Sequence, residues 1–166
     1  MKIKAYNRQS AVNYAKKWAY GRNPNYYDFE NVGGDCTSFA SQCIYAGSNV
    51  MNYNKINGWY YKNGNDKTPS WSGVEFLYDF LVTNKGIGPY GFETSINEIE
   101  VGDIAQLKFE RSDTYGHTLF IIDTKKPINL SNILIATHTF DIYGKQISKY
   151  DFSKIRFIHI DGVRIQ

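Results

Sequence analysis

The sequence predicts an α+β domain in which N-terminal helices pack on a C-terminal antiparallel sheet. In the first half of the chain, apolar residues recur at three- and four-residue steps, which is the period of a helix. From residue 101 onward they fall in short runs of strand length. The two patterns are segregated rather than interleaved, which favours an antiparallel sheet with helices packed against it. With 166 residues and no repeats, we expect a single domain spanning residues 1–166.

The helix that follows the glycines at positions 33 and 34 is the element around which the chain is organised. Asp35 can cap this helix, because a carboxylate at that position accepts hydrogen bonds from the free N–H groups of the first turn. Cys36 then lies in the first turn, where the helix dipole favours a thiolate. We expect the helix to end near Gly47. Its apolar face comprises Phe39, Ala40, Cys43, Ile44 and Gly47.

Two further helices are expected, one on either side of this helix along the chain. The first runs from Ser10 to Tyr20, with Asn7 or Ser10 as its cap. Residues 48–71 have no clear period but contain several large aromatic residues, so we expect a long, ordered loop. Another helix follows, with Ser72 as its cap. Its expected buried face comprises Val74, Phe76, Leu77, Phe80 and Leu81.

The second half of the chain predicts four strands. The Val101-Gly102-Asp103 segment is typical of a turn that leads into the first of them. In the last strand, His159 alternates with Phe157, and we interpret this histidine as structural. The expected strands cover residues 104–109, 118–122, 132–139 and 155–160.

The two cysteines have different surroundings in the sequence. Cys43 lies on an apolar helix face and is expected in the core, which is the usual place for a cysteine in such a pattern. Cys36 has polar neighbours, so a reactive thiol and a small buried residue both remain open for it. Seven helical residues separate the two cysteines by about 10 Å, which is too far for a disulfide.

Three histidines could supply a base for a reactive cysteine. A cysteine nucleophile needs an imidazole to take its proton and a third polar group to fix the imidazole tautomer. His117 begins an apolar strand, His138 lies at the end of the next one, and Asp141 follows it. We therefore expect Cys36 and His117 to act together, with either His138 or Asp141 as the third group. The alternative for His117 is a structural histidine at a strand edge.

A metal site is the competing interpretation of the same residues. His117, His138 and Asp141 could form a set of two histidines and one carboxylate. No pair of them has a close ligand spacing such as His-x-x-x-His, and catalytic zinc needs three convergent protein ligands. The sequence therefore favours cysteine chemistry without a metal.

Charge and hydropathy argue against a nucleic-acid partner and against a membrane span. The net charge is +3, and no block of Lys and Arg resembles a nucleic-acid patch. No run of about 18 apolar residues predicts a membrane span, and the N-terminal residues do not resemble a signal peptide. We expect a monomer that is either cytoplasmic or a domain of a longer exported chain.

Short blocks along nearly the whole chain resemble the amidase_6 family of amidase domains. The Gly-Gly-Asp-Cys-Thr block, the Gly-Asp-Ile turn and the later histidine are together the most specific of them. Thr118 departs mildly from the pattern, because relatives commonly carry serine or another small residue there. The blocks are Tyr6-Asn7-Arg8, Ala11-Val12, Tyr14-Ala15, Trp18, Asn23-Pro24, Tyr26, 33–37, 39–42, 58–60, Ser70-Trp71, 101–104, Gln106, Gly116-His117, His138-Thr139 and Asp141.

This resemblance implies a papain-like fold related to the NlpC/P60 and CHAP hydrolases of peptidoglycan. It implies Cys36 as the nucleophile and His117 as the base, with no cofactor. His138 best matches the third position, and Asp141 is close enough in sequence to orient the ring instead. The resemblance also implies a peptidoglycan peptide as substrate and a location at the cell wall, as one domain of a longer chain.

The sequence is consistent with three hypotheses for the function. The first is a cysteine amidase or peptidase, and the second is a transferase in which an amine replaces water. The third is a non-catalytic domain that binds glycan or peptide. Several aromatic residues in the loops either line a cleft or pack beneath the loops, and both interpretations stay open. They are Tyr26, Tyr27, Trp59, Tyr60 and Trp71.

Overall fold

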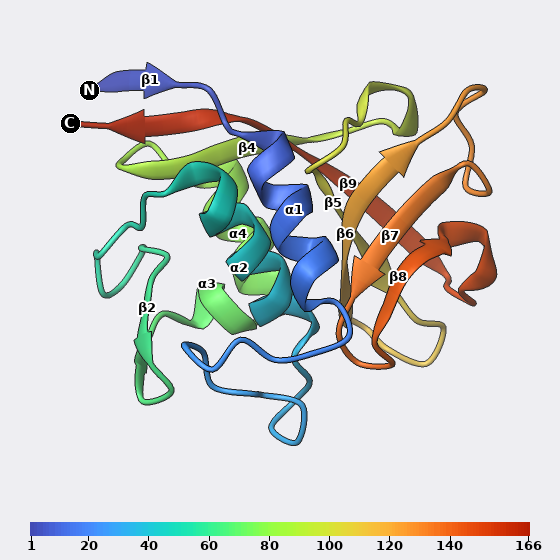
Figure 1. Cartoon of the computed structure of the whole chain (residues 1–166), viewed down its shortest axis with the longest axis horizontal. Coiled ribbons are helices and arrows are strands. Elements are labelled where there is room, and N and C mark those ends of the chain that lie inside the picture. The colour runs from blue at the N-terminus through green and yellow to red at the C-terminus, as the bar shows by residue number, and fades with distance from the viewer.

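Helices pack against one face of a large antiparallel sheet in the computed structural model, which describes residues 1–166 (Figure 1). The mixed α+β class that the sequence predicts is therefore confirmed, whereas the papain-like relation stays a prediction. The helices are α1 (Arg8–Trp18), α2 (Cys36–Ser48), α3 (Pro69–Ser72) and α4 (Val74–Thr83), with short 3-10 turns at η1 (Ile96–Glu98) and η2 (Ile147–Lys149).

The main sheet has seven strands in the order β1-β9-β5-β6-β7-β8, and β4 also pairs with β9. All of these pairs are antiparallel. A small hairpin of β2 and β3 stands apart. The strands are β1 (Lys2–Lys4), β2 (Tyr61–Asn63), β3 (Asp66–Lys67), β4 (Gly88–Thr94), β5 (Ile104–Lys108), β6 (His117–Thr124), β7 (Ile133–Thr137), β8 (Ile142–Gln146) and β9 (Lys154–Ile165).

The two ends of the chain lie side by side in the sheet. Lys2 of β1 is paired with Ile165 of β9, and Figure 1 shows both termini at the same edge of the molecule. β9 is the longest strand and pairs with β1, β4 and β5. It therefore joins the N-terminal segment to the C-terminal half of the domain.

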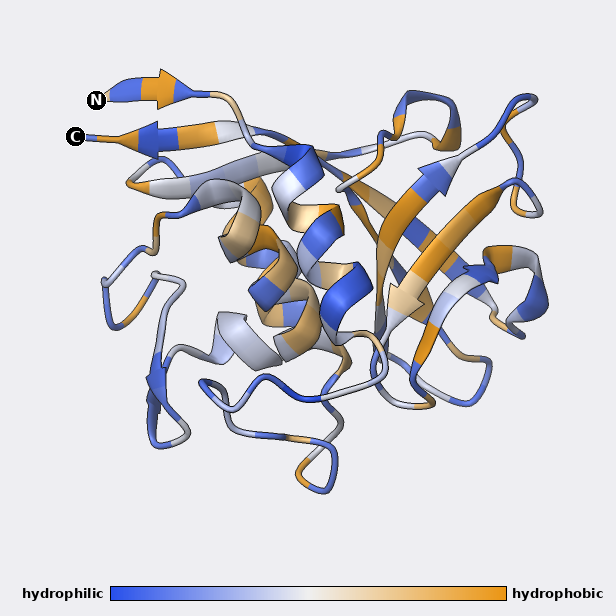
Figure 2. Ribbon diagram, in the orientation of Figure 1, coloured by the Kyte–Doolittle hydropathy of each residue, from blue (hydrophilic) through white to orange (hydrophobic).

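The core divides between the two faces of the sheet, because successive side chains of a strand point to opposite faces. On β6, Phe120 and Ile122 pack with the helices, whereas Leu119 and Ile121 pack on the other face beneath loops. The hydropathy colouring shows apolar stretches along β6 and β7 (Figure 2).

The helices occur where the sequence predicts them, with local corrections. The N-cap of α1 is Asn7, whose side chain accepts from the Ser10 N–H at 3.0 Å. α2 continues past Gly47, which packs against the ring of Tyr6, to a left-handed Asn49. Phe76, expected on the buried face of α4, is 57% exposed.

The long segment between α2 and α4 is more regular than the sequence predicts. It contains β2, β3, α3 and a bridge between Asn52 and Trp59. Trp59 and Trp71 are completely buried, and Tyr60 is nearly so. For these three residues, packing under the loops is confirmed as their role. Tyr26 stacks on Trp71 at a ring distance of 5.7 Å, and Tyr27 is half-exposed.

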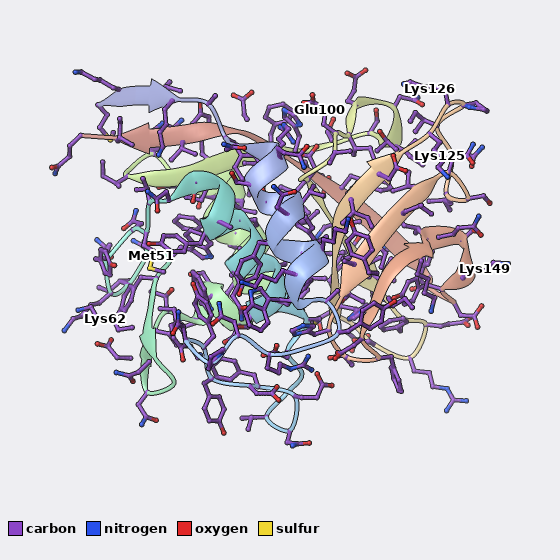
Figure 3. The ribbon with its side chains drawn as sticks, in the orientation of Figure 1. Met51, Lys62, Glu100, Lys125, Lys126 and Lys149 are labelled. Carbon is purple, nitrogen blue, oxygen red and sulfur yellow. The ribbon has the colours of Figure 1, made fainter.

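Surface charge is spread over the molecule. Among the labelled side chains, Lys62 lies on the hairpin at one end, whereas Lys125, Lys126 and Lys149 lie around the far end of the sheet (Figure 3). None of the helices combines the length and the apolar character that a bilayer crossing requires.

Candidate active site

α2 begins directly after a tight loop. Gly34 has φ +95°, a left-handed conformation that glycine adopts without steric cost. Cys36 is the first residue of the helix. The N–H groups of the first turn precede the first backbone hydrogen bond of this helix, from the Phe39 N–H to the Asp35 carbonyl. These free donors and the helix dipole both point toward the cysteine.

The expected capping role of Asp35 is wrong. Asp35 occupies the N-cap position, but its side chain makes no capping hydrogen bond. One carboxylate oxygen accepts from the Phe29 N–H at 2.9 Å, and the other contacts Nδ1 of His138. The carboxylate is 1% exposed, so these contacts replace the water it has lost.

The start of α2 is joined to the start of β6. The hydroxyls of Thr37 and Thr118 are hydrogen-bonded at 2.9 Å. The sulfur of Cys36 lies 3.8 Å from the Thr37 hydroxyl and also accepts from the backbone N–H of Thr118. His117 is the first residue of β6 and immediately precedes Thr118. The structure therefore brings Cys36 and His117, which are far apart in the sequence, to one junction.

Cys36 and His117 are both nearly buried, with exposed fractions of 5% and 6%. Burial raises the pKa of the Cys36 thiol, although hydrogen bonds from Thr118 and Thr37 oppose the shift. Burial, with a smaller effect from Lys145, lowers the pKa of His117 to about 4. At neutral pH the resting pair is therefore a thiol and a neutral imidazole, not a preformed ion pair.

Tyr150 lies beside both members of this pair. Its ring is 5.8 Å from the ring of His117, between ring centres, and the Lys145 ammonium lies 3.8 Å above its centre. Burial, and then the neighbouring Cys36, raises the pKa of the Tyr150 phenol to about 12. The sulfur of Cys36 makes no hydrogen bond to the His117 ring, whose other aromatic neighbour is Phe109 at 6.3 Å.

His138 lies on the other side of the start of α2, where both of its ring nitrogens have partners. Its Nδ1 contacts Asp35, and its Nε2 lies 2.9 Å from the Trp18 carbonyl. Because a carbonyl only accepts, Nε2 must donate, so Nδ1 and the carboxyl group of Asp35 share one further proton. The ring also stacks on Phe39. Neither nitrogen is left for the ring of His117, so the structure does not bring His138 to the expected third position.

Asp141 is also engaged elsewhere. Its carboxylate binds Arg22 at 2.8 Å, and the same guanidinium reaches Asp28 at 3.1 Å and Asp35 at 3.7 Å. Asp141 therefore helps to hold the loop before α2 and does not contact His117. His117, His138 and Asp141 do not converge, and no cluster of three or more potential metal ligands is present.

Residues of the site that the sequence did not reveal come from polar or unpatterned segments. Tyr150 follows a 3-10 turn between β8 and β9, where nothing in the local pattern marks it. None of the five main surface cavities is lined by Cys36 or His117. Tyr150 and Phe109 are the aromatic groups that adjoin the pair.

Fold and site together define an α+β domain with a cysteine at a helix N-terminus beside a histidine-bearing strand. The chain belongs to the amidase_6 family, described as "Putative amidase domain", whose pattern matches residues 5–160. This description suggests amide hydrolysis in general terms.

Two proteins of Bacillus subtilis (strain 168), both described as uncharacterized, are similar to the chain. YhbB is 31% identical over 123 residues, which cover 73% of the chain and 38% of YhbB. YjcM is 26% identical over 102 residues, which cover 61% of the chain and 22% of YjcM. The chain thus spans well under half the length of either relative. No solved structure matches it.

Proposed function

We propose that the chain hydrolyses an amide bond by acyl transfer, with Cys36 as the nucleophile and His117 as its base. The observation that supports this proposal best is the junction of α2 and β6. There the Thr118 N–H binds the Cys36 sulfur, and His117 is the preceding residue. A nucleophile can be activated by a helix N-terminus or by an adjacent base. At this junction Cys36 begins α2, and His117 is the strand residue next to Thr118.

His117 is neutral in the resting state, as a general base must be, although a pKa of about 4 makes it a weak base. A pKa of about 4 keeps His117 neutral at physiological pH, and a neutral imidazole can accept a proton. In the proposed reaction it takes the proton of the Cys36 thiol as the sulfur attacks the amide carbonyl. His117 then gives this proton to the leaving amine, and water hydrolyses the thioester.

The first turn of α2 supplies donors for the oxyanion. The backbone N–H groups of Cys36, Thr37 and Ser38 have no partner within the helix, because its first hydrogen bond starts at Phe39. Negative charge that develops on the carbonyl oxygen beside the sulfur would be stabilised by such groups. Loss of one oxyanion donor typically slows a reaction by about 10²–10³-fold.

The near-complete burial of Cys36 and His117 sets a condition on this reaction. A substrate must displace the groups that adjoin the pair, and Tyr150 lies beside the His117 ring and close enough to Cys36 for the two groups to interact electrostatically. The side chain of Tyr150 is also in contact with Lys145 at its outer face. We therefore include movement of Tyr150 in the proposal.

The substrate that we propose is a peptide of bacterial peptidoglycan, and the site of action is the cell wall. This part rests on the resemblance to the NlpC/P60 and CHAP hydrolases. Each curated relative is much longer than the region that matches this chain. The proposal therefore places this region as one domain of a wall-associated protein.

Digestion of purified muropeptides, followed by mass spectrometry of the products, tests the proposal. We expect the wild type to release an amine and a carboxylic acid at one amide bond. Cys36→Ala and His117→Gln should abolish this release, whereas Cys43→Ala should retain it, because Cys43 is completely buried in the core.

Two results would replace the proposal. Products that carry an added amine at the new acyl end would identify a transferase. Binding to cell walls that survives Cys36→Ala, with no cleavage by the wild type on any peptide tested, would identify a binding domain.

A further inference from the structure

A chain of buried polar side chains connects Arg156, whose side chain is 9% exposed, to the proposed nucleophile. Arg156 donates to Oε1 of Gln106 from Nε at 2.9 Å and from Nη2 at 2.6 Å. Nε2 of Gln106 donates to the Thr118 hydroxyl at 3.2 Å. The Thr118 hydroxyl is 2.9 Å from that of Thr37, which lies 3.8 Å from the sulfur of Cys36.

Two groups with a single hydrogen-bonding role fix the orientation of the Gln106 amide. A guanidinium can only donate, so the amide oxygen of Gln106 must face Arg156. The Val74 carbonyl can only accept, and it lies 2.9 Å from the amide nitrogen of Gln106. Either group alone would determine the orientation of the amide, and both determine the same one.

One arrangement of the remaining hydroxyls gives every hydroxyl proton in the chain an acceptor. Thr118 accepts from Gln106, and its own proton points to the oxygen of Thr37. Thr37 accepts that proton and so directs its own toward the sulfur of Cys36. Gln106 and Thr118 are fully buried and Thr37 is 1% exposed, so no water competes for these bonds.

Arg156 itself is held firmly in place. Its guanidinium lies between the rings of Tyr78 and Tyr115, at 3.7 Å and 3.9 Å from their centres. Glu75 lies 3.4 Å from Nη2 and accepts from the Tyr115 N–H at 2.9 Å. A guanidinium stacked on aromatic rings and paired with a carboxylate has little freedom to release Gln106.

We propose that Gln106, Thr118 and Thr37 form a directional hydrogen-bond relay that points the hydroxyl O–H of Thr37 at the sulfur of Cys36 and stabilises its thiolate by hydrogen bonding. Thr37 touches the reacting atom, whereas Gln106 and Thr118 are positioning residues that act through it. The relay explains why the fold buries a polar glutamine at the centre of β5. The inference rests on the proposed function for its use in catalysis, but the relay itself can be tested without any substrate.

Other charged and titratable groups also face the sulfur. Asp35 on the same chain segment raises the pKa of Cys36, and Tyr150 adjoins it from the loop before β9. His117 begins β6 beside it, and Lys145 lies behind Tyr150. None of these groups touches Thr37 or Gln106, so substitutions in the relay can be separated from their effects.

The test is the pH dependence of Cys36 alkylation by iodoacetamide, followed by peptide mass spectrometry so that Cys43 is scored separately. Thr37→Val removes the donated proton at nearly constant volume. Loss of one hydrogen bond to a charged group corresponds to a rise in the pKa of Cys36 by about one unit. At a pH below both values, alkylation should slow about tenfold. Thr37→Ser keeps the hydroxyl and should restore the wild-type profile.

A second variant reverses the relay. In Gln106→Glu the carboxylate still pairs with Arg156, but its other oxygen can only accept, so Thr118 must turn its proton toward it. Thr37 then donates to Thr118 and no longer to the sulfur, and the pKa of Cys36 should again rise. Because both changes remove the same bond, the double variant should shift the pKa by less than the sum of the two.

Thr68→Val is the matched control, because Thr68 is equally buried but lies outside the relay. It should leave the alkylation profile unchanged. An unshifted profile in Thr37→Val, or full additivity in the double variant, would overturn the relay. If only one of the two relay variants folds, its alkylation profile alone tests the relay, because each variant is predicted to raise the pKa of Cys36 on its own. Failure to cleave muropeptides would count against the proposed function and not against the relay.

Discussion

Burial of His117 makes the stability of the domain depend on pH. Its pKa is about 4 in the folded protein and 6.5 in the reference state. Between these values the unfolded chain binds a proton that the folded protein excludes, so stability is complete above pH 6.5 and falls as pH approaches 4. The difference corresponds to about 3 kcal/mol. Urea denaturation at pH 7 and pH 4 should show this loss in the wild type.

His117→Gln provides the comparison for that measurement. Other carboxylates titrate over the same range, so the absolute slope is not informative by itself. We expect the difference in free energy of unfolding between wild type and variant to shrink by about 3 kcal/mol from pH 7 to pH 4, because the variant has no imidazole to protonate. A difference that stays constant with pH would show that His117 is accessible to protons in the folded state.

We predict that Tyr150 limits access to the thiol. Its ring adjoins His117 and its phenol interacts electrostatically with Cys36, so truncation should open the junction to solvent. We expect Tyr150→Ala to speed iodoacetamide labelling of Cys36 by about tenfold or more at pH 8, and Tyr150→Phe to change it little. Labelling of Cys43, measured in the same digests, should remain slow in both variants. Equal rates for Cys36 in wild type and Tyr150→Ala would indicate that another group covers the site.

A site residue can be predicted from the sequence only where its immediate neighbours along the chain mark it. Cys36 after two glycines and His117 at the head of an apolar strand are visible because each is marked by its immediate neighbours. The partners of His138 are not visible, because Asp35 and Trp18 belong to distant segments. Polar contacts between segments depend on the tertiary fold, and no short-range pattern encodes them.

At the scale of elements, His138 connects the end of α1, the start of α2 and the end of β7. Removal of its imidazole would leave the Asp35 carboxylate buried with the Phe29 N–H as its remaining hydrogen bond. We expect His138→Phe, which keeps a ring for stacking on Phe39, to cost about 3–5 kcal/mol in the free energy of unfolding.

Equilibrium unfolding in urea checks that prediction, and Asp141→Asn is its control. The Asp141 carboxylate pairs with Arg22 in a contact where both side chains are more than a quarter exposed. A pair of that kind contributes at most about 1 kcal/mol. Similar losses in the two variants would mean that the contact between His138 and Asp35 carries no special weight.

Helices with a strong apolar period were predictable from the sequence, and short strands were not. α1, α2 and α4 begin within about two residues of their expected starts. β1, β4 and β8 were missed because they are short or partly exposed and show no regular alternation. Their conformation is set by pairing with β9 or β7, which is a long-range interaction.

At the scale of the whole molecule, the segregation of helical and strand patterns was enough to predict the class. It did not predict how the N-terminal segment attaches to the sheet. That attachment depends on Asp103, which is fully buried and accepts from the Ile160 N–H at 2.9 Å and the Glu100 N–H at 2.7 Å. Arg8 and His159 also bind its carboxylate, at 2.8 Å and 2.9 Å.

Loss of this carboxylate should therefore destabilise the domain as a unit. Asp103→Ala removes the acceptor of two backbone N–H groups and the buried carboxylate that pairs with Arg8 and His159, which costs about 3–5 kcal/mol. For a domain of this size, the melting temperature should fall by about 10 °C.

Glu100→Gln is the matched control. Glu100 is 58% exposed and its contact with Arg8 is 3.4 Å long, so removal of its charge should cost under about 1 kcal/mol. Thermal unfolding followed by circular dichroism distinguishes the two, and a single transition shifted as a whole in Asp103→Ala would show that the N-terminal segment and the sheet unfold together. If instead the N-terminal segment detached in a separate, earlier transition, Asp103 would join two units that fold independently.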